Sequence, residues 1–234
     1  MVKISSSTKK AYTLVELSIV LVIIAIFLSS GLNIFTNNIV QTKTVNTKEK
    51  LNIIYKSLAE HLMTQKRLPC PTILATPKDS NTSYGSPTAT PCSTTGGVPT
   101  RVLDLPSDMA EDDFGNKILY VVDARLTVSS FIAPNDGQGA ILITGNNSTQ
   151  PMLLLLSYGA NSCGATKINV APNIPCDENN NNDGEDQLEN SDNDTTFTTT
   201  STHPKFDDVI LTKTYYDFLQ ELNLTQTQAQ AYFK

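Results

Sequence analysis

An apolar run near the N-terminus constrains this chain more than any other feature. Residues 11–35 contain a single charged residue, Glu16, and residues 17–28 are apolar except for Ser18. About 20 helical residues rise roughly 30 Å, which is the thickness of the hydrocarbon core of a bilayer. The run therefore predicts a membrane-spanning helix.

The basic residues that precede the run predict its orientation. Residues 1–10 carry Lys3, Lys9 and Lys10 and no acid. Positive charge before an apolar span keeps the N-terminus in the cytoplasm, so we expect the rest of the chain on the periplasmic side of the inner membrane. A secretory signal peptide has a similar arrangement. Against that alternative, no cleavage site is well placed after the run, and apolar residues continue at near-helical spacing at Ile39, Val40, Leu51, Ile54, Leu58 and Leu62.

Glu16 is unusual because a carboxylate inside a membrane span is costly without a partner. It belongs to the segment KKAYTLVEL at residues 9–17, which resembles the prepilin processing motif of type IV pilins and type II secretion pseudopilins. In that family a prepilin peptidase cleaves after a small residue, usually Gly, and methylates the new N-terminus, usually Phe. The resemblance implies cleavage between Ala11 and Tyr12, with Ala and Tyr as departures. It also implies that Glu16 pairs with the N-terminal amine of a neighbouring subunit.

Together these features divide the chain into parts. Residues 1–11 are expected to be a cleaved cytoplasmic leader, residues 12–35 a transmembrane and polymerisation helix, residues 36–66 the amphipathic half of the same helix, and residues 67–234 a periplasmic or extracellular head. Pro69 and Pro71 are expected to end the helix. The leader holds three of the 17 basic residues and none of the 23 acidic ones, so processing changes the net charge from −6 to −9.

The head is predicted to contain a small antiparallel sheet. Residues 72–100 are rich in Pro, Ser, Thr and Gly and read as a loop, and residues 214–234 read as a short terminal helix. A long helix packed on such a sheet gives an α+β, pilin-like fold with a loop-rich C-terminal region. The strand candidates, which are enriched in β-branched and aliphatic residues, are Lys117–Val122, Leu126–Ile132, Gly139–Thr144, Met152–Tyr158 and Val209–Thr212.

Short blocks in the head resemble segments of the major pseudopilin. They are Asp113–Tyr120 (DFGNKILY), Leu156–Asn161 (LSYGAN) and Phe206–Ile210 (FDDVI). Phe114 stands where that family usually has Trp, and Asn161 stands where it usually has Asp. The resemblance in the head is therefore weaker than the resemblance at the N-terminus.

All four cysteines lie beyond the apolar run, which is consistent with disulfides in an oxidising periplasm. Four cysteines allow three pairings. Pairing within the two most irregular stretches, Cys70 with Cys92 and Cys163 with Cys176, is favoured. The spacing lacks the C-x₂-C pairs typical of a zinc site.

Residues 177–194 form an acidic loop that repels itself unless a cation binds. An EF-hand loop anchored on Gly184 fits poorly, because position 190 is Asn. Two interpretations stay open: a looser Ca²⁺ site, which the resemblance implies because the major pseudopilin carries Ca²⁺ in its C-terminal loop, and a solvated loop that binds nothing. The resemblance implies the ligands Ser157, Asn161 and Asp207 or Asp208, whereas local acid density favours Asp183, Glu185, Asp192 and Asp194.

Several classes of function are disfavoured. The acidic balance argues against a surface that neutralises nucleic-acid phosphates, so no nucleic acid is expected as a partner. There are two histidines, His61 and His203, and neither lies near a recognisable nucleophile. No nucleophile elbow, Walker loop or dinucleotide-binding motif occurs, so the chain is not expected to be an enzyme.

The resemblance implies a structural subunit of a type IV pilus-like or type II secretion pseudopilus filament. Its expected partners are copies of itself, other pilins or pseudopilins, the prepilin peptidase and the inner-membrane assembly platform. A minor tip subunit that binds DNA, a surface or a secreted substrate is the first alternative. A membrane-anchored periplasmic enzyme is the second.

Overall fold

The computed structural model describes residues 13–80, 83–88, 92–128, 139–144, 149–168, 174–176, 185–192, 194–199 and 206–232. Two compact units are present, one ending at Thr42 and one formed by Lys43–Lys234. We call the second unit the head. The predicted cleavage site between Ala11 and Tyr12 lies outside the described residues.

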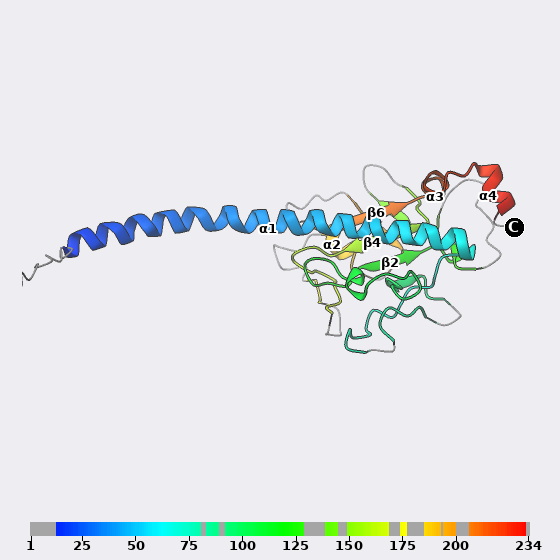
Figure 1. Ribbon diagram of the computed structural model, residues 1–234, viewed down its shortest axis with the longest axis horizontal. Helices are drawn as coiled ribbons and strands as arrows, with labels where there is room; N and C mark the ends of the chain where they lie inside the picture. The colour runs from blue at the N-terminus through cyan, green and yellow to red at the C-terminus, as the bar shows by residue number, and fades with distance from the viewer. Residues whose placement is uncertain are drawn as a thin grey trace, which may run out of the picture. The chain divides into compact units, whose positions relative to one another are not determined.

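The long predicted helix is confirmed. Helix α1 runs from Leu14 to Gln65, against the expected 12–66, and is drawn from blue to cyan in Figure 1. It ends where Lys66 adopts a positive φ of 56°, the left-handed conformation that often terminates helices. Pro69 and Pro71 follow at once and prevent the helix from resuming.

The N-terminal half of α1 exposes its apolar side chains. Six consecutive residues, Ile19–Ile24, each keep between 47% and 59% of their surface accessible. Consecutive residues point in different directions around a helix, so this stretch is apolar on all sides. Within the residues that the structure describes, no helix is both long and apolar enough to cross a bilayer. The membrane-spanning role of residues 12–35 stays a prediction.

The head is built on a four-stranded antiparallel sheet. Its strands, in spatial order, are β1 (Thr95–Gly97), β2 (Leu119–Val122), β4 (Leu153–Ser157) and β6 (Val209–Lys213). Tyr120 lies opposite Leu155, which in turn lies opposite Leu211. Strands β2 and β4 are buried on both faces, which explains their unbroken aliphatic sequences.

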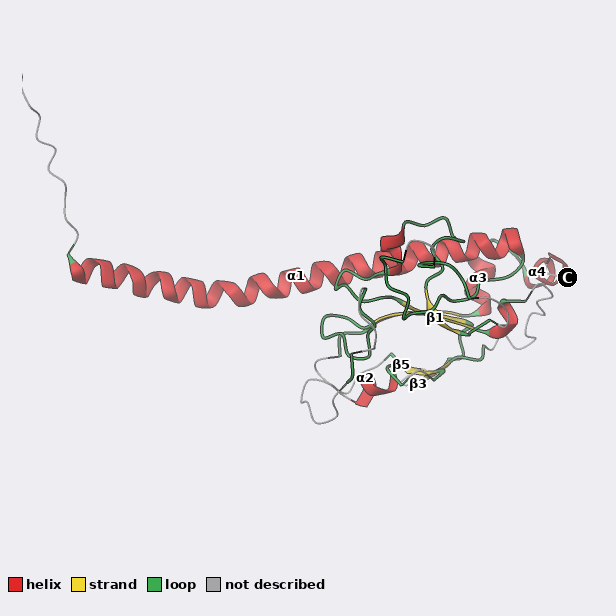
Figure 2. Ribbon diagram, turned by 90° about the horizontal axis from the view of Figure 1, so that it is seen from below, coloured by secondary structure: helices red, strands yellow, loops and turns green. Residues whose placement is uncertain are grey.

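Two apolar cores lie on the two faces of this sheet, because successive strand residues point to opposite sides. On one face, Tyr120, Val122, Leu153 and Leu155 pack in the same cluster as α1 residues Leu51, Ile54, Leu58 and Leu62. On the other face, Leu119, Val121, Leu154 and Leu156 cluster with Ile141, Ile143 and Phe197. Figure 2 shows the head layers in this order, with the sheet between α1 and the segments carrying β3, β5 and α2.

The second face is covered by a smaller, parallel pair of strands, β3 (Leu142–Thr144) and β5 (Thr196–Thr198). The acidic region also contributes a short helix, α2 (Glu185–Glu189). The predicted terminal helix is two helices, α3 (Tyr215–Glu221) and α4 (Gln226–Tyr232). A capping box between Thr214 and Asp217 starts α3.

Two expectations for the head are wrong. A strand was expected at Leu126–Ile132, but Leu126 ends a 3₁₀ turn, η2 (Ala124–Leu126). The Asp123 side chain starts this turn by accepting a hydrogen bond from the Arg125 backbone N–H. The remaining described residues to Val128 form no strand, and residues 129–132 lie outside the described part. The predicted loop 72–100 contains β1. A further 3₁₀ turn, η1, spans Ser107–Ala110.

The disulfide pairing favoured from the sequence is the one that the structure forms. Cys70 bonds Cys92, and Cys163 bonds Cys176, with Cα atoms 5.4 and 4.9 Å apart. The bonded cysteines are 22 residues apart in the first bridge and 13 residues apart in the second. The described residues between them form no helix or strand, so the bridges constrain segments that have no regular secondary structure in their described parts.

Candidate functional site

Glu16 lies in the first turn of α1, on an exposed part of the helix. Its backbone N–H donates to the Thr13 side-chain oxygen (3.2 Å), so Thr13 caps the helix. Among the residues that the structure describes, the Glu16 carboxylate has no hydrogen-bond or ion-pair partner. A Thr followed three residues later by Glu is also the sequence of a capping box, but of its two hydrogen bonds the described residues show only the one from the Glu16 N–H to the Thr13 side chain.

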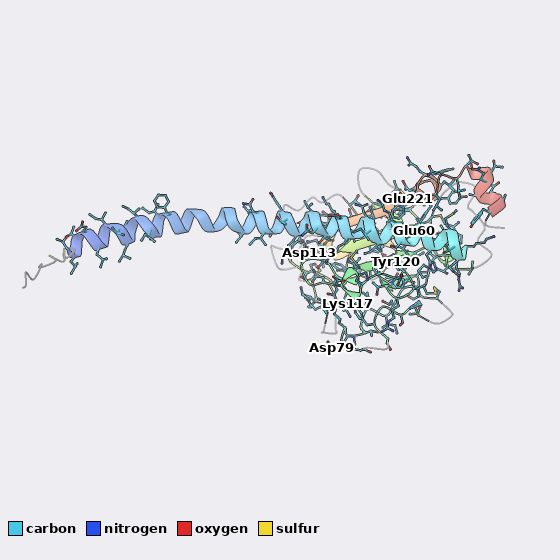
Figure 3. All side chains as sticks on the ribbon, viewed as in Figure 1. Glu60, Asp79, Asp113, Lys117, Tyr120 and Glu221 are labelled. Carbon is cyan, nitrogen blue, oxygen red and sulfur yellow. A yellow bond between two sulfur atoms is a disulfide. The ribbon has the colours of Figure 1, made fainter. Side chains whose placement is uncertain are left out.

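In the head, the turn at Asp113 docks on α1 through polar contacts. Asp113 forms an ion pair with Lys50 (2.7 Å) and accepts a hydrogen bond from the Asn46 amide (2.9 Å). Its backbone N–H donates to the buried hydroxyl of Thr47 (3.3 Å). Burial raises the pKa of Asp113, but the bonds from Lys50 and Asn46 outweigh it and lower that pKa below its usual value. Figure 3 labels Asp113 beside the helix.

The neighbouring Asp112 organises the buried part of the same block. One carboxylate oxygen accepts the backbone N–H groups of Phe114 (2.9 Å) and Asn116 (2.8 Å). The other accepts the Asn116 amide (3.1 Å) and the Ser157 hydroxyl (2.6 Å). Asp112 is only 4% exposed, so these bonds compensate the loss of hydration. Asp112 thereby joins the 112–116 turn to the end of β4.

The ligands implied by the resemblance are brought near one another, but most of their oxygens already have partners. Ser157 donates its hydroxyl to Asp112, and the Asn161 side-chain oxygen accepts from the Cys163 backbone (3.1 Å). One Asp207 oxygen accepts the backbone N–H groups of Ala160 (2.5 Å) and Asn161 (2.9 Å). Loop 157–161 is thus tied to Asp207 directly.

Gly159 makes this close approach possible. It has a positive φ of 60°, and a Cβ atom there would lie 2.4 Å from the Asp207 carbonyl oxygen. A larger residue would therefore push the loop away from Asp207.

Two amide side chains contact the neighbouring carboxylates Asp207 and Asp208. Gln187 of α2 donates to Asp207 (3.0 Å), and Asn190 just after α2 donates to Asp208 (2.8 Å). These two residues are three apart, so they lie on one face of the short helix. Sequence reasoning missed both, because amides carry no metal-ligand or catalytic spacing that would single them out. We call the two amide residues and the two carboxylates that they contact, Gln187, Asn190, Asp207 and Asp208, the amide clasp.

The amide clasp contains two buried oxygens without a hydrogen-bond partner among the described residues. They are Oε1 of Gln187 and Oδ1 of Asp208. Gln187 is 1% exposed. Burial raises the pKa of Asp208 to about 7, an effect that the Asn190 bond reduces and the neighbouring Asp207 charge increases. Burial also raises the pKa of Asp207, against the hydrogen bonds that it accepts.

The second predicted ligand set does not converge in the described part of the chain. Asp183 lies outside the described residues, as does the side chain of Glu185. The Asp192 carboxylate accepts a hydrogen bond from the Asp194 backbone N–H (3.1 Å), and the Asp194 carboxylate accepts one from the Thr196 backbone N–H (2.5 Å). Both carboxylates therefore shape the turn before β5. Over the described ranges, no group of three or more His, Cys, Asp or Glu side chains is placed to hold a metal ion.

Comparison with known proteins bears on the N-terminus. A family model described as the prokaryotic N-terminal methylation motif matches residues 6–32, which include Ala11, Tyr12 and Glu16. No curated protein and no solved structure matches the chain. The chain therefore carries a prokaryotic N-terminal methylation motif, in agreement with the resemblance of residues 9–17 to type IV pilins and type II secretion pseudopilins.

Proposed function

We propose that this protein is a structural subunit of a type IV pilus-like or pseudopilus filament. The observation that carries the proposal is the methylation motif at residues 6–32, which overlaps a stretch of α1, Ile19–Ile24, whose apolar side chains are exposed all around the helix. Packing this stretch against lipid or against other copies removes its apolar surface from water, which is favourable. The two apolar cores of the head contain no residue of this stretch.

In this proposal the chain is first held in the inner membrane, with the N-terminus in the cytoplasm and the head in the periplasm. The prepilin peptidase cleaves between Ala11 and Tyr12 and methylates Tyr12. The assembly platform then transfers the helix from lipid into a bundle of copies. Glu16 pairs with the N-terminal amine of a neighbouring subunit, which compensates the burial of its carboxylate and sets the axial register.

The role of Glu16 is tested by two substitutions that separate charge from helix capping. Glu16→Gln keeps the length and hydrogen-bonding capacity of the side chain and removes its charge, whereas Glu16→Ala removes both. Both variants should be cleaved and methylated, as read by mass spectrometry of the N-terminal peptide, and both should fail to form filaments by electron microscopy. Filaments from Glu16→Gln but not from Glu16→Ala would show that capping, and not the charge, is the function of this residue.

We also propose that the amide clasp binds Ca²⁺ weakly. The orphaned, buried oxygens of Gln187 and Asp208 support a cation there, because each lacks the partner that a buried oxygen requires. Asp207 and Asp208 would supply the negative charge and Gln187 an amide oxygen, and oxygen ligands of this kind suit Ca²⁺. The bound ion would compensate the burial of Asp208.

Thermal unfolding of the full chain in detergent tests the cation. Millimolar Ca²⁺ should raise the melting temperature of the wild-type head. The shift should disappear in Asp208→Asn and persist in Asp113→Asn, the same change at a half-buried carboxylate outside the amide clasp. An unchanged wild-type melting temperature would refute the Ca²⁺ site and leave the filament proposal untouched.

A further inference from the structure

Lys167 lies against the side chain of a buried asparagine. Its ammonium group donates to Oδ1 of Asn116 (2.6 Å) and to the hydroxyl of Ser162 (2.8 Å). The C=O bond of an amide is about 1.23 Å long, so Lys167 Nζ is within about 4 Å of the Asn116 amide carbon. Reactive pairs held in near-attack geometry are about 3–3.5 Å apart. A small movement of the lysine side chain would bring the two atoms into that range.

The backbone holds this pair in register. Asn116 and Lys167 face each other in an isolated antiparallel bridge, and the Lys117 N–H donates to the Thr166 carbonyl (2.9 Å). Residues that are directly opposite across such a bridge have neighbouring side chains. The approach of Lys167 to Asn116 is therefore built into the fold and does not depend on a chance contact of a surface lysine.

The amide of Asn116 is fixed in one orientation. Its nitrogen donates to Asp112 (3.1 Å) and to the carbonyl of Gly159 (2.8 Å), which leaves its oxygen facing Lys167. Asn116 is fully buried and Asp112 is 4% exposed. The network both orients the amide for attack and keeps water away from its carbon, so hydrolysis does not compete.

From this arrangement we infer that Lys167 and Asn116 form an intramolecular isopeptide bond. The Lys167 ammonium loses two protons, a bond forms between its Nζ and the Asn116 Cγ, and the bond between Cγ and Nδ2 breaks. Nδ2 takes up the two protons and leaves as ammonium, so atoms and charge balance without an oxidant or cofactor. Asp112 acts as a positioning residue that holds the leaving nitrogen on the side away from the lysine.

Such a bond would give the head a third covalent tie. It would join the 112–116 turn, which docks on α1, to the segment that follows the first cysteine of the Cys163–Cys176 bridge. The turn and this segment would then stay together under reducing conditions and under tension along a filament. A hydrogen bond between the same side chains would give neither property.

Mass spectrometry of the full chain, reduced and denatured, tests the bond. The wild-type mass should fall short of the mass expected from the sequence and its N-terminal processing by one ammonia. Proteolysis should release a branched peptide that joins the segments containing Asn116 and Lys167. Lys167→Arg should have its full expected mass, whereas Lys78→Arg, a change at a lysine that pairs with Glu111 (2.9 Å), should still lack one ammonia.

A second variant keeps the test independent of folding failures. Asn116→Asp should reach the same cross-linked mass as the wild type, because water leaves in place of ammonia. A wild-type protein of full mass after prolonged incubation would overturn the inference. Loss of ammonia without a branched peptide would also overturn it, since cyclisation of an asparagine with its own backbone gives the same mass change.

Discussion

The two halves of α1 have the same backbone conformation and opposite surroundings. In the N-terminal half, Ile23 and Phe27 are 47% and 74% exposed, whereas in the C-terminal half Ile54 and Leu58 are completely buried. The C-terminal half is amphipathic and presents one apolar face to the sheet. In the N-terminal half, the apolar side chains of Ile19–Ile24 are exposed all around the helix.

This difference indicates where each half obtains its stability. The C-terminal half is stabilised by tertiary packing within its own head. Under the proposed function, the N-terminal half would be covered by lipid or by other copies of the chain. Substitutions in the two halves should therefore separate folding from assembly.

The largest expected effect contrasts one buried and one exposed aliphatic residue of α1. Leu58→Ala should lower the free energy of unfolding of the head by about 2–5 kcal/mol, because it leaves a cavity between α1 and the sheet. Ile23→Ala should change it by less than about 0.5 kcal/mol, since its side chain is 47% exposed and belongs to neither apolar core of the head. Chemical denaturation in detergent measures both. An equal loss for both variants would show that the two halves do not differ in the isolated subunit.

The head should also differ from the N-terminal half in its response to pH, because of Asp208. The unfolded chain releases this proton near pH 4, whereas the folded head retains it to about pH 7. The folded state binds the proton more tightly, so stability should decline as pH rises between these values, by as much as about 4 kcal/mol, and then level off. Asp208→Asn should flatten this dependence. Denaturation midpoints measured from pH 4 to pH 8 without Ca²⁺ check the sign, and a rise over this range would contradict it.

The disulfides provide a third contrast, since both lie in the head. Replacing Cys70 and Cys92 by Ser should cost about 2–4 kcal/mol of stability, because the unfolded chain gains freedom. Replacing Cys163 and Cys176 should cost about 0.5 kcal/mol less, because that loop is shorter. Urea unfolding of the two double variants measures the difference. A larger loss for the Cys163–Cys176 pair would show that native contacts, and not loop length, determine its contribution.

The smallest expected effect compares two adjacent carboxylates of the head. Asp112→Asn should destabilise the head by about 1–3 kcal/mol, because it disturbs four hydrogen bonds, three of them buried. Asp113→Asn should cost at most about 1 kcal/mol, since its ion pair with Lys50 is partly exposed to water. Denaturation curves of the two variants decide the order. A greater cost for Asp113→Asn would mean that docking on α1 matters more than the buried network.

Elements with a strong local pattern were predictable from the sequence. The bounds of α1 differ from the prediction by no more than two residues, because a long apolar run and following prolines leave few alternatives. Strands β2, β4 and β6 lie within or nearly within their predicted ranges, since they are aliphatic and pass through the middle of the core. The pairing of the four cysteines was also predictable, because each cysteine bonds its neighbour in the sequence.

Elements that depend on distant partners were not predictable. The sequence Thr-Gly-Gly of β1 has low strand propensity, and it is a strand because it pairs with β2. Residues 126–128 have a strand-like composition, yet the Asp123 side chain holds the preceding residues in a 3₁₀ turn. The amide clasp brings residues about 20 positions apart into contact, and no spacing in the sequence marks it.

The features of the N-terminal segment are local in the chain and could be read from its residues: a methylation motif, an apolar run and a single acid within that run. The polar groups that meet in the head could be found only from the folded structure. Asp112 with Asn116 and Ser157, Lys167 with Asn116, and Asp208 with Asn190 are contacts of the fold. The physical reason is that apolar burial depends on composition and period, whereas each buried hydrogen bond requires one particular partner at one particular distance.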